Sequence, residues 1–179
     1  MPDYACFNLC LRSEIPLPEL SEIALAGSRD VVTVSCGPVK DIGTETLRHE
    51  GRITILNLPG IGRFRIEAGT SIVVDGAPDC SDRNLRLFLL GSALGVLVHQ
   101  RGLLPLHANA VILAGRALAF TGPSGAGKST LAAWFSDHGY PVLCDDVCVI
   151  GVEGGAPVAY RGLPRLKLWA DAAEKRGQT

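Results

Sequence analysis

Residues 117–135 read ALAFTGPSGAGKSTLAAWF, and this stretch decides the expected fold. It opens with an apolar run, passes through a glycine-rich segment and continues into a helix-forming pattern. Residues 122–129 match the pattern Gly-x-x-x-x-Gly-Lys-Ser/Thr of a phosphate-binding loop, which lies between a strand and a helix. The order strand, loop, helix predicts that the phosphates of a nucleoside triphosphate bind here.

The residue types in this loop suit an anionic ligand. Glycines let successive backbone N–H groups turn toward phosphate oxygens, and a helix N-terminus adds about half a positive charge. Lys128 is expected to bridge the β- and γ-phosphates, and Ser129 is expected to coordinate magnesium through its hydroxyl. The expected nucleotide-binding residues are Gly122, Pro123, Ser124, Gly125, Ala126, Gly127, Lys128, Ser129 and Thr130, the last of them in the first turn of the helix.

Two adjacent carboxylates, Asp145 and Asp146, follow an apolar run at residues 142–144. A strand ending there would bring them close to the γ-phosphate. One carboxylate could hold magnesium while the other takes the proton from an attacking hydroxyl. Neighbouring residues of a strand point to opposite faces, so one of the two is expected to face the site squarely. A simple turn opener is the alternative interpretation.

His107 lies 15 positions before Gly122 (122 − 107 = 15) and precedes the apolar run 108–113. A neutral imidazole near the γ-phosphate could orient a carboxylate or a hydroxyl; a surface or core histidine is the alternative. Other side chains are interpreted as structural or solvated: His49, His99 and His138 at turns or helix ends, Trp134 and Phe135 in the core, and Arg161 and Arg165 in a loop from which they could reach phosphate.

Three segments, Leu106-His107, residues 122–129 and Asp145-Asp146-Val147, together resemble the catalytic domain of the HPr kinase/phosphorylase family. The resemblance covers residues 103–150, with histidine, loop and paired aspartates in the family's order and at similar spacing. It implies ATP- and Mg²⁺-dependent phosphorylation of a serine hydroxyl on a peptide or small protein. It also implies catalytic roles for His107, Lys128, Asp145 and Asp146, with Asp145 as the base and with Ser129 and Asp146 as metal ligands.

The chain departs from the family in three respects. Thr130 stands where phosphorylase members carry glutamate, which leaves the second metal contact and the reverse phosphorolysis open. The front half resembles HPr-kinase-like proteins of peptide-modification clusters, including lasso-peptide precursor kinases, which favours a peptide over HPr as the substrate. The family's domain also continues past residue 179 with a glycine- and arginine-rich catalytic loop, so an incomplete, C-terminally truncated catalytic domain is expected.

The expected organisation is a small β-rich domain over residues 1–80, followed by an α/β P-loop kinase domain with a mixed β-sheet over residues 81–179. Short apolar or alternating runs between Gly, Pro and Asp predict the first set of strands, at 7–11, 31–34, 52–58, 63–67 and 71–74, with a hairpin at 58–62. Ser81 or Asp82 caps a long helix that ends at Gly102.

The second domain is expected to combine five strands with two helices. Strands are predicted at 108–113, 117–120, 142–144, 147–150 and 156–160, with a tight turn at 114–116. One helix runs from the loop to just before Gly139, and a last one covers 165–176.

Composition excludes several classes of protein. With 179 residues, 47% of them hydrophobic and 20% charged, the chain is expected to fold into one ordinary or two small globular domains. A net charge of −1 gives no basic surface for nucleic acid, which is not an expected partner. The most membrane-like segment, 85–98, is shorter than the roughly 20 apolar residues of a bilayer span. No membrane partner is therefore expected.

Six cysteines without a Cys-x-x-Cys pair, and the lack of a signal-peptide pattern, indicate a reducing cytoplasm. Two alternatives to the serine kinase are open: a nucleotide- or peptide-binding module without turnover, and a small-molecule kinase. Assembly into a homo-oligomer is also left open.

Overall fold

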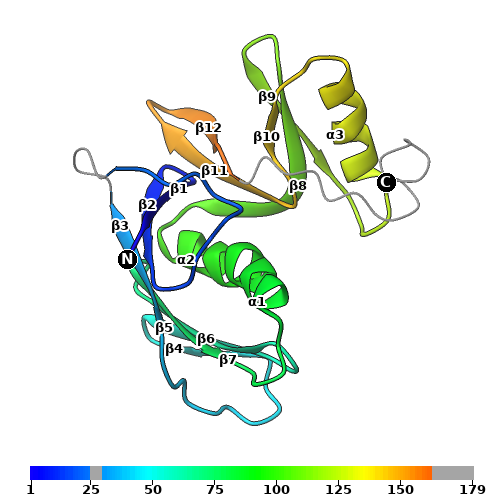
Figure 1. The fold of residues 1–179 in the computed structure, drawn as a ribbon. Coiled ribbons are helices and arrows are strands. Elements are labelled where there is room, and N and C mark those ends of the chain that lie inside the picture. The colour runs from blue at the N-terminus through cyan, green and yellow to red at the C-terminus, as the bar shows by residue number, and fades with distance from the viewer. Residues whose placement is uncertain (25–29, 163–179) are drawn as a thin grey trace. The chain divides into compact units, whose positions relative to one another are not determined.

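The protein's computed structural model describes residues 1–24 and 30–162, which divide into two compact units. The first unit is Met1–Leu104 and the second begins at Pro105 (Figure 1). The division lies further along the chain than the boundary expected at residues 80–81. The reason is that the helical segment after residue 81 packs against the sheet of the first unit.

Unit 1 is built on a seven-stranded sheet with the order β1-β2-β3-β7-β6-β5-β4. β2/β3 and β3/β7 are parallel pairs, and the other neighbours are antiparallel. The hairpin predicted at 58–62 is confirmed, because Leu58 of β5 lies opposite Gly62 of β6. The strands are β1 (Asp3–Cys6), β2 (Leu9–Ser13), β3 (Val31–Cys36), β4 (Leu47–Glu50), β5 (Ile53–Leu58), β6 (Gly62–Glu67) and β7 (Ser71–Gly76).

The single strand predicted at residues 7–11 is wrong, because a turn occupies its first two positions. Phe7 and Asn8 have φ angles of 49° and 64°, and they connect β1 to β2 where Cys6 lies opposite Leu9. Two consecutive residues with positive φ are what a type I′ hairpin turn requires. Phe7 is unusual there, but its side chain is fully buried, so the packing of its ring offsets the unfavourable backbone conformation.

One continuous helical segment covers residues 82–100, as predicted. It consists of α1 (Asp82–Phe88), one π-helical turn η1 (Leu89–Ala93) and α2 (Leu94–Gln100). The Ser81 hydroxyl accepts a hydrogen bond from the Asn84 amide and caps its start, while Gly102, at φ 77°, follows its end. Among the described residues, no helix has both the length and the apolarity that a bilayer crossing requires.

The core of unit 1 lies between this helical segment and the sheet, with η1 and α2 packed against β6. Its buried side chains come from alternate positions of β3, β6 and β7 and from one stripe of the helical segment. They include Val32, Val34, Phe64, Ile66, Ile72, Val74, Leu89, Leu90, Ala93, Leu94, Leu97 and Val98.

Replacing Phe64 with alanine is expected to lower the free energy of unfolding by about 3–5 kcal/mol, since the ring is completely buried and its removal leaves a cavity. Urea denaturation measures the loss. The exposed Leu47 of β4 provides the control, for which Leu47→Ala should change the free energy by less than about 0.5 kcal/mol. Equal losses at the two positions would contradict this description of the core.

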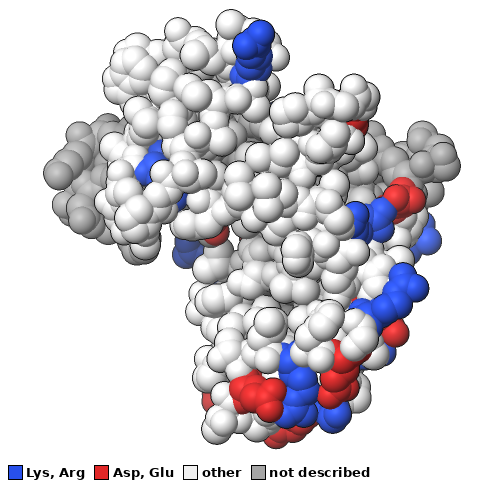
Figure 2. All heavy atoms as spheres, turned by 180° about the vertical axis from the view of Figure 1, so that it is seen from behind, with Lys and Arg blue, Asp and Glu red and all other residues white. Residues whose placement is uncertain are grey.

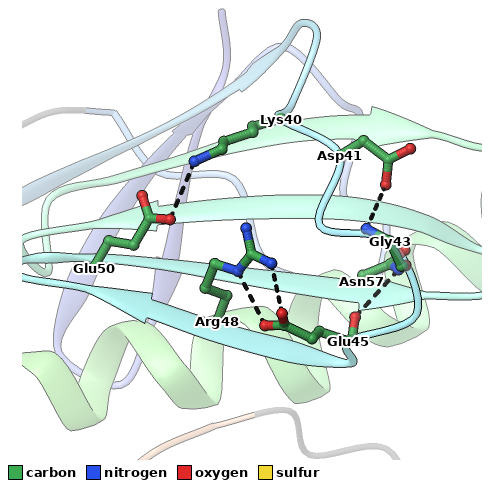
Figure 3. A network of polar contacts seen from close by, with 7 residues as sticks. All are labelled: Lys40, Asp41, Gly43, Glu45, Arg48, Glu50 and Asn57. Atoms are coloured by element: carbon green, nitrogen blue, oxygen red, sulfur yellow. Dashed lines mark hydrogen bonds and ion pairs between the residues drawn. The ribbon is translucent and has the colours of Figure 1, made fainter.

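A polar network joins the segment before β4 to β4 and β5 (Figure 3). Lys40 pairs with Glu50 at 3.2 Å, Arg48 with Glu45 at 3.0 Å, and the Asn57 amide donates to the Gly43 carbonyl at 2.9 Å. Exposed ion pairs contribute little to stability. The buried apolar cluster of Val39, Ile42 and Ile55 therefore anchors this segment.

Charged side chains of both signs lie close together on the surface of unit 1 (Figure 2). Several of them form ion pairs, among them Arg63 with Asp75 at 3.2 Å and Arg65 with Glu67 at 2.8 Å. This pairing balances positive and negative charge along β6.

The described residues of unit 2 form five strands and the helix α3 (Lys128–Asp137). β8 is central and pairs with β9, β10 and β11, while β12 pairs with β11. Ala114 and Gly115, both at positive φ, form the predicted tight turn between β8 and β9. The strands are β8 (Leu104–Leu113), β9 (Arg116–Thr121), β10 (Val142–Cys144), β11 (Val147–Glu153) and β12 (Ala156–Tyr160).

The predicted α/β class is wrong. The described residues are mostly β, with 44% of them in strands and 18% in helices. An α/β P-loop domain needs helices interleaved between its strands. Here two residues, Asp145 and Asp146, separate β10 from β11, and Gly154 and Gly155 separate β11 from β12. Such short connections leave no chain for crossover helices. The helix predicted at 165–176 lies outside the described residues.

Candidate functional site

The loop at residues 122–127 connects β9 directly to α3, which matches the predicted order strand, loop, helix. Gly125 and Gly127 have φ angles of 82° and 84°. A Cβ atom at either position would meet nothing within 4 Å, so backbone conformation rather than space favours glycine there. The course of the loop therefore depends on these two glycines.

The first turn of α3 carries no side-chain cap. Gly127 is the N-cap residue, and because glycine has no side chain it cannot accept a hydrogen bond from the turn as Ser81 does in α1. The first backbone N–H groups of a helix lack intrahelical partners and carry partial positive charge. An anion at the start of α3 would accept hydrogen bonds from these N–H groups and balance their partial positive charge.

Lys128 folds back over the loop that precedes it. Its ammonium group donates to the carbonyl oxygens of Gly122 at 2.8 Å and Pro123 at 3.0 Å. An ammonium group has three donors, and these two bonds hold the positive charge beside the loop. The side chain is half-buried, so the conformation of the loop and the location of the charge depend on each other.

Three polar side chains from three different segments meet near the start of α3. Asn109 of β8 donates through its side-chain Nδ2 to Asp145 Oδ1, and the same nitrogen lies 3.5 Å from Ser129 Oγ. Asn109 is 1% exposed and Asp145 is 2% exposed. The carboxylate and the serine hydroxyl are thus linked through one buried amide.

Asp146 contacts a different residue from the one that Asp145 contacts. Nδ1 of His107 lies 3.1 Å from the carbonyl oxygen of Asp146 and 3.2 Å from its Oδ1. Both partners are acceptors, so the imidazole carries a proton on Nδ1 and, when neutral, has its acceptor at Nε2. These two side chains are more open to solvent than Asp145, at 59% for His107 and 30% for Asp146.

The backbone at Asp146 adopts an uncommon conformation. Its φ angle is 74°, and the Val147 amide donates to the Asp145 carbonyl at 3.0 Å, closing a three-residue turn around Asp146. A turn of this kind with positive φ is rare and strained. It directs the two carboxylates to separate partners, Asp145 to Asn109 and Asp146 to His107.

Two thiols flank the carboxylates and belong to the core. Cys144 and Cys148 are fully buried in an apolar cluster that includes Ala108, Ala110 and Leu143. A hydrogen bond with Cys148, together with burial, holds the pKa of the Cys144 thiol above its usual range. Cys144 is therefore a neutral, small apolar side chain at physiological pH. None of the six cysteines forms a disulfide bond, and all six lie within the described residues.

Most of the remaining predicted residues are exposed to solvent. Pro123, Ser124, Ala126 and Thr130 are exposed along the loop and the first turn. Trp134 is 51% exposed and stacks on His138, so its prediction as a core residue is wrong. Arg161 is exposed after β12, and Arg165 lies outside the described residues. Within residues 1–24 and 30–162, no group of three or more His, Cys, Asp and Glu side chains is arranged to hold a metal ion.

Asn109 is the site residue that sequence reasoning missed. The available signal was an amide between Ala108 and Ala110 in a strand with an apolar pattern. A buried polar side chain requires a hydrogen-bond partner, but sequence does not say which one.

Comparison of the chain with protein-family models, with curated proteins and with solved structures gives no match in any of the three.

Proposed function

We propose that this protein binds ATP with Mg²⁺ in the loop of residues 122–129 and transfers the γ-phosphoryl group to a serine hydroxyl of a peptide or small protein. One observation carries the proposal: Ser129, Asn109 and Asp145 meet beside a glycine-dependent loop at an uncapped helix start. The proposal rests on this local arrangement and does not depend on the α/β class.

The loop supports binding of the phosphates. Backbone N–H groups of Gly125 and Gly127 and of the first turn of α3 would supply donors and partial positive charge for the β- and γ-phosphate oxygens, while the Ala126 N–H already donates to the Pro123 carbonyl at 3.2 Å. Lys128 would exchange its bonds to the Gly122 and Pro123 carbonyls for bonds to phosphate. This exchange moves the ammonium charge only a short way, because it already lies against the loop.

The donor set beside the loop fits magnesium. Mg²⁺ prefers oxygen ligands and is commonly held by one or two carboxylates together with substrate phosphates. The Ser129 hydroxyl and the Asp145 carboxylate supply oxygen ligands of this kind, and both contact Asn109. When bound, Mg²⁺ would neutralise the charge that develops on the transferred phosphoryl group.

These contacts favour Asp145 as the metal ligand and Asp146 as the base, the reverse of the roles expected from the sequence. Asp145 is buried and linked to Ser129, as suits a metal ligand. Asp146 is more open to solvent and accepts a hydrogen bond from His107, as suits a base that must reach a substrate. In the proposed reaction, Asp146 takes the proton of the serine hydroxyl, the oxygen bonds to the γ-phosphorus, and the bond from this phosphorus to the β–γ bridging oxygen breaks to release ADP.

The acceptor class rests on the family resemblance. A cytoplasmic location rests on the cysteine pattern of the sequence, with which six cysteines without a disulfide bond agree. Incubation of the full chain with Mg²⁺, ATP and serine-containing peptides, followed by mass spectrometry, tests the transfer. A phosphoserine that requires both Mg²⁺ and Lys128 is the expected product. Phosphorylated metabolites without phosphopeptides would instead identify a small-molecule kinase.

A binding module without turnover is the second candidate. The observation that favours it is the strand-rich fold, in which α3 is the one helix among the described residues of unit 2. Saturable ATP binding together with unmodified peptides would support this candidate over the kinase.

A further inference from the structure

Asn109 is a buried amide to which the proposed reaction assigns no step. It is 1% exposed, and its neighbours in β8, Ala108 and Ala110, are fully buried. An amide removed from water is unfavourable unless it is hydrogen-bonded. The two side chains that its Nδ2 contacts, Asp145 and Ser129, both belong to the proposed site.

In the sheet, Asn109 lies beside both strands that lead to the proposed site. Asn109 lies opposite Phe120 of β9, the strand that leads into the loop. The next residue, Ala110, lies opposite Cys144 of β10, the strand that leads to Asp145. A side chain on a central strand is held more precisely than one on a loop. Asn109 therefore sits between the segment that carries Ser129 and the segment that carries Asp145.

The chemistry of an amide suits both contacts at once. A carboxylate only accepts hydrogen bonds, so the Asn109 nitrogen, with its two hydrogens, faces Asp145. A serine hydroxyl has two acceptor lone pairs, so Ser129 can accept from the amide and still offer a lone pair to a cation. An aspartate at position 109 would have the same shape but would accept where asparagine donates.

We propose that Asn109 is a positioning residue that holds the Asp145 carboxylate and the Ser129 hydroxyl at the spacing at which they bind Mg²⁺ together with ATP. This inference rests on the proposed function and adds a residue that touches neither the nucleotide nor the peptide. Partners of this kind, which orient the ligands of a metal, often change metal affinity strongly when they are replaced.

The first test is calorimetry of ATP binding to the full chain, with MgCl₂ and with EDTA. In Asn109→Ala, the gain in ATP affinity due to Mg²⁺ should fall by about 10–100-fold, while metal-free ATP affinity changes by less than about threefold. Asn57→Ala is the matched control, because the Asn57 amide donates to the Gly43 carbonyl in unit 1, and it should leave both affinities unchanged.

A second variant keeps the test decisive if Asn109→Ala does not fold. In Asn109→Asp, two carboxylates face each other beside Ser129 and repel unless a cation lies between them. Its melting temperature should rise with MgCl₂ in the absence of nucleotide, since a ligand that binds the folded state stabilises it. The melting temperature of Asn57→Asp should not change with MgCl₂.

The outcomes separate this inference from the proposed function. If the parent chain binds Mg²⁺ and ATP while folded Asn109→Ala keeps the full effect of Mg²⁺, the role of Asn109 is refuted and the nucleotide site stands. If MgCl₂ does not raise the melting temperature of Asn109→Asp, the role of Asn109 is also refuted. If the parent chain binds no ATP, both the site and the role of Asn109 are refuted.

Discussion

Replacing Lys128 with alanine is expected to lower the rate of phosphoryl transfer by roughly 10²–10³-fold, because a preorganised charge is removed from the point where charge develops in the transition state. The structure adds a second reason. The ammonium group bonds to the Gly122 and Pro123 carbonyls, so the variant also loses two contacts that hold the loop. Quantitative mass spectrometry of the phosphopeptide, followed over time, measures the rate.

Lys40→Ala is the control for this prediction. Lys40 carries the same charge, but its contact is an exposed ion pair with Glu50 in unit 1. Its removal should leave the transfer rate unchanged. Lys128→Arg retains the charge, but the planar guanidinium does not match the position of a compact ammonium group. Full activity of a folded Lys128→Ala variant would refute the proposed kinase.

Replacing Asp146 with asparagine should reduce transfer by roughly 10²–10⁴-fold, the usual contribution of a general base. Asparagine has the shape of aspartate and tolerates positive φ better than most residues, so the turn at 74° is preserved. Binding of ATP with Mg²⁺, measured by calorimetry, should persist, because the loop and the Ser129–Asn109–Asp145 contacts are unaffected.

The corresponding change at Asp145 tells the two carboxylates apart. Asp145→Asn should weaken the effect of Mg²⁺ on ATP binding, since the carboxylate is linked to Ser129 through Asn109. Asp41→Asn, at an exposed carboxylate of unit 1, is the control for both variants. If Asp146→Asn loses the effect of Mg²⁺ and Asp145→Asn loses only transfer, the roles are those expected from the sequence, with Asp145 as the base.

Much of the local structure was predictable because it depends on neighbouring residues. The hairpin at 58–62, the capped helix after Ser81 and the strand, loop and helix around Gly122–Lys128 follow from turn residues, caps and periodicity. Such signals act within a few residues, and the structure confirms these elements.

Other features depend on contacts that the sequence does not display. Phe7 adopts positive φ within a hairpin turn because its ring is buried, although its apolar run predicts a strand. The α/β class is wrong because a phosphate-binding loop does not by itself bring helices between the strands of its sheet, and two-residue connections join β10, β11 and β12. In each case tertiary packing and connection length outweighed the local pattern.

The candidate site was predictable as a set of residues but not as a set of contacts. The motif and the paired carboxylates identified Ser129, Asp145 and Asp146 from residue type and spacing. Their partners come from β8, about 20 to 40 positions away in the chain, through Asn109 and His107. The strand register decides which side chains meet, and register is set by the whole sheet.

Calorimetric titration of the full chain with ATP and MgCl₂ tests the central claim most directly, which is that residues 122–129 bind a triphosphate. The expected result is a saturable, one-to-one heat of binding that weakens strongly in Lys128→Ala and not in Lys40→Ala. No heat of binding to the folded chain at millimolar ATP and Mg²⁺ would contradict the claim, and the proposed kinase activity with it.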